Sequence, residues 1–342
     1  MASDEFHGVN LADALSAAAR LASDQRRVYD RGLARHEPAA KPRENCLPAA
    51  VGFFYDPAAI PLPADPPAQR PALVPPMPLP TVTTTRLPVG RGAVNDVAVL
   101  ARAIPLFPVD REMRLAVVAD ARAAAPRRIG WAACFLKAYA MVAREQPLLR
   151  SWLVRGLRSR LATASQSVAT LAINRPDEHG ADRLFFARLA SPDMLPLTAV
   201  QAFVDRHATA PVDELFRRQL ELEMVPGWLR RTILRWNMSS ASPKRPGRIG
   251  TFSMSSLAGF SAGNHFHPTL CTTSLCQGPL DDAGRCRVTL IADHRVLDGA
   301  TVAKGLQRLE EVLGREIAAE LRTLPAAAAP PANPPALPAA AA

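Results

Sequence analysis

The stretch TLIADHRVLDGATVAKGL, residues 289–306, decides how the C-terminal part of this chain folds and where its chemistry lies. The alternating residues that lead up to Ala292 predict a β-strand, and the apolar spacing after Gly299 predicts a helix. His294 and Asp298 fall in the short turn between these two elements. The turn therefore presents an imidazole at the end of a buried strand and a carboxylate directly before a helix.

Each residue of this turn has a structural and a chemical interpretation. A histidine near a strand end often serves only the core, and Asp298 is suited to cap the helix that follows it. A neutral imidazole, however, titrates at about pH 6.5 and can remove a proton from a thiol or hydroxyl, provided that its other nitrogen is held in one tautomer. Gly299 allows a ligand or another backbone to approach the turn closely.

A second segment, RIGTFSMSSLAG at residues 248–259, offers a partner for His294. It places Ser253, Ser255 and Ser256 in an extended run that ends in small residues. A hydroxyl at a strand end can donate a hydrogen bond to a developing oxyanion, which is worth about 3–4 kcal/mol per donor. Taken alone, the segment is equally well a polar strand followed by a loop.

Together, GTFSMSSLAG and LIADHRVLDGATVAKGLQRLEEVL resemble the acyltransferase catalytic domain of 2-oxo acid dehydrogenase complexes, a fold shared with chloramphenicol acetyltransferase. The motif DHRxxDGA after a strand, preceded by a segment like GTFxxSxLG, carries the resemblance over residues 248–314. It extends more faintly to the apolar residues 128–153 and to residues 190–208, and it does not cover residues 1–80.

The resemblance implies a role for each matching residue. His294 would be the general base that takes the proton from the thiol of coenzyme A or of another acceptor, and Ser255 would hydrogen-bond the tetrahedral oxyanion. Asp298 would order the site around the histidine, through an arginine that the sequence does not identify. The thiolate would attack the carbonyl directly, without an acyl-enzyme. In this family the histidine and serine meet across a subunit interface, so the resemblance implies a homotrimer or higher multiple with acyl-CoA as substrate and no metal.

We therefore expect an α+β, chloramphenicol acetyltransferase-like two-layer fold, with a mixed β-sheet packed by helices and the active site at a trimer interface. An N-terminal helix and a proline-rich arm are expected over residues 1–80. The catalytic domain is expected over residues 81–322, and a disordered Ala/Pro tail over residues 323–342.

Residue spacing inside the catalytic domain predicts its strands and helices. Strands are expected at residues 81–89, 167–175, 184–189, 250–257 and 286–292. Helices are expected at residues 92–104, 109–126, 129–153, 196–208, 212–225 and 299–321.

The chain departs from the family in segments that concern the acceptor. Residues 1–90 contain one lysine, Lys41, which is not flanked by strand-like runs, so we predict no covalently bound lipoyl group. Residues 176–189 and 267–278 replace stretches that shape the substrate channel in the family, which puts a lipoyl acceptor in doubt.

The arginine-rich residues 224–248 are also atypical, and three interpretations of them stay open. They could line a cofactor phosphate site, lie on a membrane as a basic amphipathic helix with Trp228 and Trp236, or form a solvated surface helix.

Composition limits the partners and the compartment. The net charge of +10 comes almost entirely from scattered arginines, with no nucleic-acid-binding module, so nucleic acid is not an expected partner. The five cysteines form no CxxC pair, which suits free thiols in a reducing cytoplasm. Neither a run of 18 apolar residues nor a secretory signal pattern is present in this sequence, and we expect a cytoplasmic protein.

Three functions are compatible with these observations. The first is an acyltransferase that moves an acyl group between a thioester and an unidentified thiol or hydroxyl acceptor. The second is a non-catalytic trimeric scaffold whose N-terminal arm binds a protein partner, and the third is a detoxifying acetyltransferase for a small hydroxylated compound. The joint presence of His294, Ser255 and Asp298 favours an enzyme, because a scaffold needs none of the three.

Overall fold

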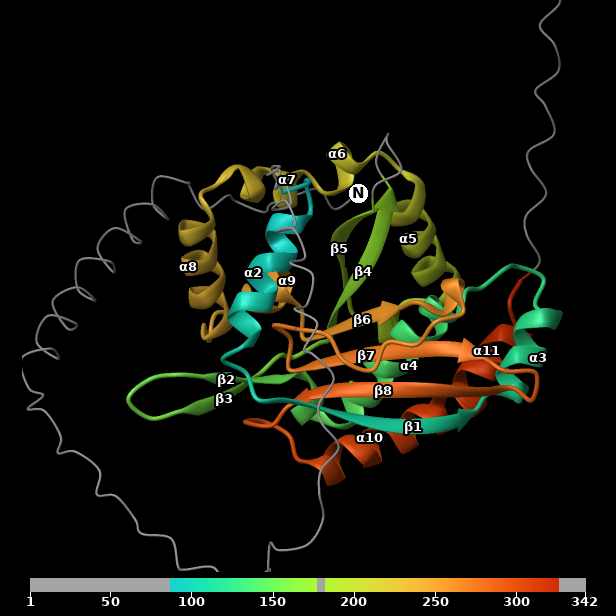
Figure 1. The fold of residues 1–342 in the computed structure, drawn as a ribbon. Coiled ribbons are helices and arrows are strands. Elements are labelled where there is room, and N and C mark those ends of the chain that lie inside the picture. Colours follow the sequence, from blue (N-terminus) through green and yellow to red (C-terminus); the bar gives the residue numbers. More distant parts are fainter. Residues whose placement is uncertain (1–86, 177–181, 326–342) are drawn as a thin grey trace, which may run out of the picture. The chain divides into compact units, whose positions relative to one another are not determined.

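The computed structural model describes residues 87–176 and 182–325. The N-terminal helix and arm expected over residues 1–80, most of the strand expected at residues 81–89 and the tail beyond residue 325 lie outside the described residues. In the described part, a β-sheet packs against a layer of helices (Figure 1).

The main sheet of the described chain is mixed and has six strands in the order β1-β8-β7-β6-β4-β5. Its strands are β1 (Leu106–Arg114), β4 (Val168–Pro176), β5 (Asp182–Ala190), β6 (Phe252–Ser256), β7 (Thr273–Leu280) and β8 (Arg285–Asp293). Strand β6 runs parallel to both of its neighbours, and the other pairs are antiparallel. A separate hairpin pairs β2 (Ser151–Val154) with β3 (Arg160–Thr163).

The two faces of the sheet differ in character because side chains alternate along each strand. Leu275 and Leu290 are paired across β7 and β8, and both are fully buried in the core. On the opposite face, Ser255, Cys276 and Thr289 are aligned across β6, β7 and β8. The face away from the main core thus carries small polar side chains, including the serine that the sequence singles out.

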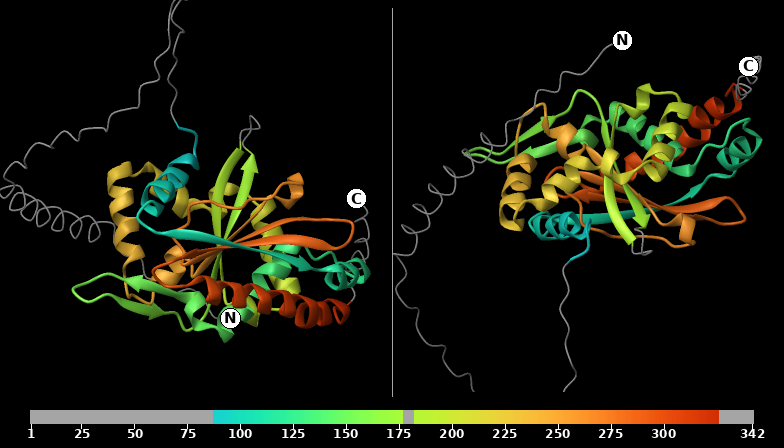
Figure 2. Two further views of the ribbon diagram at one scale, coloured as in Figure 1. Left: turned by 60° about the horizontal axis from the view of Figure 1, so that its bottom comes forward. Right: turned by 90° about the horizontal axis from the view of Figure 1, so that it is seen from above.

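Helices cover the apolar face and one end of the sheet. They are α2 (Arg91–Ala101), α3 (Ala116–Ala124), α4 (Trp131–Glu145), α5 (Leu197–Thr209), α6 (Val212–Leu215), α7 (Arg217–Met224), α8 (Gly227–Met238), α9 (Arg245–Ile249), α10 (Gly299–Val312) and α11 (Ala318–Arg322). A π-helical turn, Leu313–Ile317, joins α10 to α11, and the two run along the sheet (Figure 2). Among the described residues, no helix is long and apolar enough to cross a membrane.

Helix α4 forms the centre of the core. Most of its side chains are buried, and the ring of Tyr139 lies 4.7 Å from the ring of Phe252 on β6. The Tyr139 hydroxyl donates to Thr273 Oγ1 on β7 at 2.8 Å, so this buried polar group is satisfied. Burial raises the pKa of the Tyr139 phenol, which therefore stays protonated and available as a donor.

The expected α+β fold class, a mixed sheet packed by helices, is confirmed, but the helix expected at residues 109–126 is wrong. Residues up to Arg114 belong to β1, and a helix begins only at Ala116. Strand β1 lies at the edge of the sheet, where Pro108 costs no interior hydrogen bond and charged residues can face water. Those charged residues hid the period-2 pattern of the strand.

Other boundaries also differ from expectation. The helix expected at residues 129–153 ends at Glu145, shortly before Pro147, and the chain then enters the hairpin of β2 and β3, which was not expected. Strand β7 was missed because its buried positions include polar residues such as Thr273 and Gln277. The helix expected at residues 212–225 is split at Phe216 into α6 and α7.

The arginine-rich segment is not simply a solvated surface helix. Arg230 on α8 is 8% exposed and forms an ion pair with Asp96 on α2, which is fully buried. Arg231 reaches the other oxygen of the same carboxylate at 3.3 Å. Trp228 and Trp236, in contrast, remain exposed on the outer side of α8. The ion pair thus fixes α8 against α2.

Replacing Asp96 with alanine tests this connection. Arg230 would then be buried without a counter-charge, so we expect the free energy of unfolding to fall by about 3–5 kcal/mol in urea denaturation. Asp120→Ala on α3 is the control, because Asp120 is exposed, and we expect it to change that free energy by less than about 0.5 kcal/mol. An equal, small effect of both substitutions would contradict the assigned role.

Candidate active site

His294 stands in the turn that follows β8. Its backbone N–H donates to the carbonyl of Pro105 at 2.9 Å, and its ring packs 4.7 Å from the ring of Phe107 on β1. The side chain is nevertheless exposed in the single chain. The edge strand thus fixes the position of the imidazole while one side of the ring remains accessible.

The tautomer of His294 follows from its contact within the turn. Nδ1 lies 3.1 Å from the carbonyl oxygen of Leu297. Because a carbonyl oxygen can only accept a hydrogen bond, the neutral ring must carry its proton on Nδ1. Nε2 then presents a lone pair, and no described side chain occupies it. The requirement for a general base, one nitrogen fixed and the other free, is met by the turn itself.

Asp298 lies at the end of this turn, directly before α10. Its Oδ1 accepts a hydrogen bond from the backbone N–H of Thr301 at 2.7 Å, which makes it the N-cap of α10. That hydrogen bond lowers the pKa of the Asp298 carboxyl. The cap fixes the backbone immediately after Leu297, whose carbonyl orients the imidazole. The geometry thus connects Asp298 to His294 through the backbone.

The arginine that was expected to accompany Asp298 is not seen among the described residues. The arginine of the turn, Arg295, is paired with Asp293 instead, with Nη2 and Oδ2 2.6 Å apart. This ion pair joins the two residues that flank His294 in the chain.

Only one of the three serines of β6 has a free hydroxyl. Ser253 Oγ donates to Ser274 Oγ at 2.7 Å, and Ser256 Oγ donates to the carbonyl of Gln277 at 3.4 Å. Ser255 is half-buried on the polar face, and its hydroxyl has no protein partner in the described part of the chain. Of the three, Ser255 is therefore the serine that can donate to a substrate.

The structure does not bring Ser255 and His294 together within one chain. Ser255 is aligned with Thr289 across β7, and His294 lies five residues farther along β8. At about 3.3 Å per residue this places them about 16 Å apart along the strands, in addition to two inter-strand spacings of about 4.8 Å. Ser255 thus lies near the middle of the sheet, whereas His294 lies just beyond the C-terminal end of β8.

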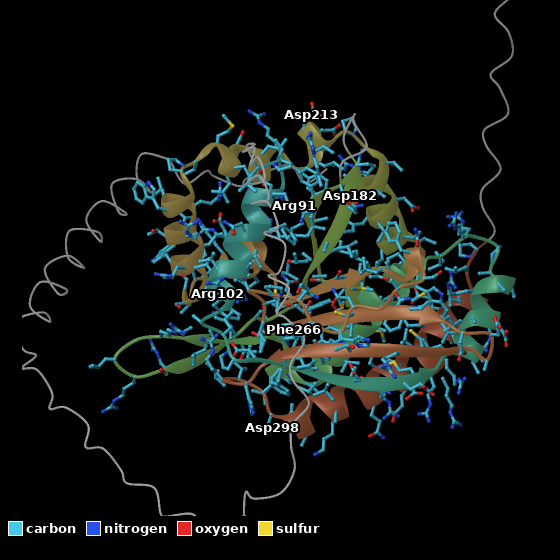
Figure 3. The ribbon with its side chains drawn as sticks, in the orientation of Figure 1. Arg91, Arg102, Asp182, Asp213, Phe266 and Asp298 are labelled. Atoms are coloured by element: carbon cyan, nitrogen blue, oxygen red, sulfur yellow. The ribbon has the colours of Figure 1, made fainter. Side chains whose placement is uncertain are left out.

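An exposed apolar segment follows Ser255. Leu257, Phe260 and Phe266 have exposed fractions of 37%, 72% and 54%. Figure 3 shows Phe266 well separated from Asp298, which lies at the start of α10. Large apolar side chains that gather on a surface commonly mark a contact with another molecule.

His267 is a polar residue of this face that the motifs did not indicate. Its Nε2 lies 2.8 Å from Ser274 Oγ, and its Nδ1 lies 3.4 Å from the Sγ of Cys276. Burial lowers the pKa of His267, so its ring is neutral at pH 7. Burial also raises the pKa of Cys276 to about 12, which keeps the thiol protonated. The only sequence signal for this cluster is the pair of histidines in NHFHP, residues 264–268.

The contacts of His267 hold the segment between β6 and β7 against the sheet near Ser255. They do not activate the Cys276 thiol as a nucleophile. Within residues 87–176 and 182–325, no group of three His, Cys, Asp or Glu side chains is arranged to hold a metal ion.

Comparison with known proteins gives structural matches only. No family model matches the sequence, and no curated protein matches it. A probable dihydrolipoamide acetyltransferase of Listeria monocytogenes 4b F2365 aligns with a TM-score of 0.48 at 17% identity, over 68% of this chain and 94% of that chain. The dihydrolipoamide acetyltransferase of Azotobacter vinelandii aligns with a TM-score of 0.48 at 18% identity, over 71% and 99% of the two chains.

A chloramphenicol acetyltransferase also aligns, with a TM-score of 0.40 at 13% identity, over 64% of this chain and 94% of that chain. These are similarities of fold, at 18% sequence identity or less.

The cap formed by Asp298 can be tested through the pH dependence of stability. Because the pKa of this carboxyl is lower in the folded chain than in the unfolded chain, its contribution is complete above about pH 3.9 and is lost as the pH falls through the folded pKa. We expect Asp298→Ala to lower Tm at pH 7 and to flatten the acid limb of the Tm profile.

Asp298→Asn is the matched control, since asparagine also caps helices but does not titrate. It should keep most of the Tm at pH 7 while losing the acid-dependent part. A wild-type Tm profile unchanged by Asp298→Ala would refute the cap.

Proposed function

We propose that this chain is an acyltransferase in which His294 deprotonates a thiol or hydroxyl acceptor and Ser255 stabilises the oxyanion. The observation that carries the proposal is the contact between His294 Nδ1 and the carbonyl of Leu297, because it leaves Nε2 as an exposed base of defined tautomer. The free hydroxyl of Ser255 supports it, since the neighbouring serines are occupied by the fold.

The reaction proceeds through one tetrahedral intermediate. Nε2 of His294 takes the proton of the acceptor as its sulfur or oxygen attacks the carbonyl carbon of an acyl thioester such as acyl-CoA. The carbonyl π electrons move to the oxygen, and the Ser255 hydroxyl donates to the resulting oxyanion. When the intermediate collapses, the C–S bond breaks and the leaving thiolate recovers the proton from the imidazolium. No acyl-enzyme forms.

The site is completed by a second copy of the chain. His294 and Ser255 lie too far apart in one copy to contact the same carbonyl. A homotrimer, as the family resemblance implies, would bring the histidine of one copy to the serine of the next. The exposed Leu257, Phe260 and Phe266 beside Ser255 supply apolar surface that such a neighbour would cover.

Complementation between two inactive variants tests this arrangement. We expect His294→Ala to lower thiol release from acetyl-CoA and longer acyl-CoAs by about 10²–10⁴-fold, because the general base is lost. We expect Ser255→Ala to lower it by about 10²–10³-fold, because an oxyanion donor is lost. When the two variants are unfolded together and refolded, mixed trimers contain interfaces with one intact His294 and one intact Ser255, so part of the activity should return.

Ser256→Ala is the control, because Ser256 is on the same strand but its hydroxyl donates to the backbone carbonyl of Gln277. Activity lost in both variants but never recovered on mixing would show that the site lies within one copy. If wild type and His294→Ala are equally inert with every acyl-CoA and acceptor, the trimeric scaffold is the better description. Transfer to small hydroxylated compounds alone would favour the detoxifying acetyltransferase.

A further inference from the structure

A cleft rich in arginine lies beside the turn of His294. Its floor and walls include the apolar side chains of Val99, Leu100, Ile104, Trp152 and Leu270. Four arginines line it, and they come from four separate places in the fold: Arg155 after β2, Arg235 on α8, Arg245 on α9 and Arg295 after β8. Apolar walls around like charges strengthen their field, so the cleft attracts anions.

The cleft contains a single carboxylate to balance these four cations. Asp293 is that carboxylate, and Arg295 occupies it with a contact of 2.6 Å. Arg155 and Arg295 both approach one neutral acceptor, the carbonyl oxygen of Ala103, at 3.5 and 3.4 Å. Arg235 is exposed and has no partner in the described part of the chain. The cleft thus has an excess of positive charge that the described residues do not neutralise.

Arg245 is the strongest sign that this charge belongs to a binding site. The side chain is 2% exposed, yet it forms no ion pair with any described carboxylate. Its guanidinium donates to the carbonyl of Gly250 at 2.7 Å and lies 4.4 Å from the ring of Trp152. Its Nε–H, buried as well, has no hydrogen-bond partner among the described residues. Burial lowers the pKa of Arg245 to about 10, which reflects the cost of a cation without a counter-ion.

The position of the cleft indicates which substrate would supply the anion. Asp293 and Arg295 line it, and they are the residues on either side of His294. In coenzyme A the long pantetheine arm separates the reacting sulfur from the phosphates. His294 itself does not line the cleft, but its two neighbours in the chain do. An anionic group bound there suits the acceptor, whose attacking atom must lie at the imidazole, better than the nucleotide end of acyl-CoA.

We propose that this cleft binds a carboxylate or phosphate group of the acyl acceptor. This inference rests on the acyltransferase function proposed above and narrows it: the acceptor is a small molecule that carries a thiol or hydroxyl a short distance from an anionic group. Arginine suits this task because its planar guanidinium can form two parallel hydrogen bonds with a carboxylate or a phosphate.

Binding of simple anions to the full-length protein tests the cleft directly. Isothermal titration with inorganic phosphate and with malonate, at constant ionic strength set by chloride, should show binding by wild type and by His294→Ala. Arg235→Gln and Arg155→Gln should each weaken it by at least about 10-fold, the loss of one charge-assisted contact. Arg217→Gln is the control, because Arg217 is exposed on α7 outside the cleft and pairs only with Glu221 there.

Paired acceptors then test the link to catalysis. The pairs are 3-mercaptopropionate with its amide and glycerol 3-phosphate with glycerol, and the two anions separate a carboxylate from a phosphate preference. For the preferred anion, Arg235→Gln should raise KM at least about 10-fold with little change in kcat, while the neutral partner is unaffected.

The outcomes separate the two proposals. Equal use of anionic and neutral acceptors, with no anion binding or with binding lost equally in Arg217→Gln, would overturn the cleft proposal and leave the acyltransferase intact. Anion binding that needs Arg235, without acyl transfer to any acceptor, would overturn the acyltransferase and with it the acceptor assignment. Circular dichroism confirms that each variant is folded.

Discussion

The hydrogen bond between His294 Nδ1 and the carbonyl of Leu297 is the contact on which the proposed chemistry of this chain depends. The two residues are close in the chain, so the hydrogen bond forms within the turn and needs no distant partner. It does require the turn to keep one conformation. Strand β8 fixes the turn at one end through pairing with β1, and the Asp298 cap fixes it at the other end through the first turn of α10. A loop freed from either constraint would let the imidazole change tautomer, and the base would be lost without any change at the ring itself.

The sheet imposes a second constraint. Because β6 is parallel to β7 while β8 is antiparallel to it, β6 and β8 run in opposite directions, and the C-terminal end of β6 is aligned with the middle of β8. His294 follows β8 five residues after the position aligned with Ser255, so a single copy can offer either the proposed oxyanion donor or the proposed base to one substrate. The proposed site shared between copies rests on this separation, and the exposed apolar residues that follow Ser255 in the chain are surface that a neighbouring copy would cover.

Sequence alone was sufficient wherever the signal is local. The strand, turn, cap and helix around His294 are contiguous, and so is the strand β6, within which the family resemblance selected Ser255. It failed for β1, since an edge strand tolerates Pro108 and charged residues that obscure its alternation, and for β7, since hydrogen bonds such as that of Tyr139 to Thr273 allow polar residues to be buried. The sequence also could not show that the hydroxyls of Ser253 and Ser256 donate hydrogen bonds within the fold, because their acceptors lie on β7.

The arginine cleft could not be predicted from the sequence either, and it gives a reason for the buried guanidinium of Arg245. The four cations of the cleft are spread over residues 155–295, and only the tertiary fold brings them together: the buried Asp96 ion pair, for example, fixes α8, which carries Arg235, against α2. Arg245 has no counter-ion among the described residues, and burying such a cation carries a desolvation cost that its hydrogen bonds to the carbonyls of Gly250 and Leu270 offset only in part. A ligand that binds only the folded chain returns stability in proportion to RT ln(1 + [L]/Kd). In the proposed function this charge couples folding to the acceptor: the same cation that is costly to bury would increase the selectivity of the cleft for an anion over a neutral isostere.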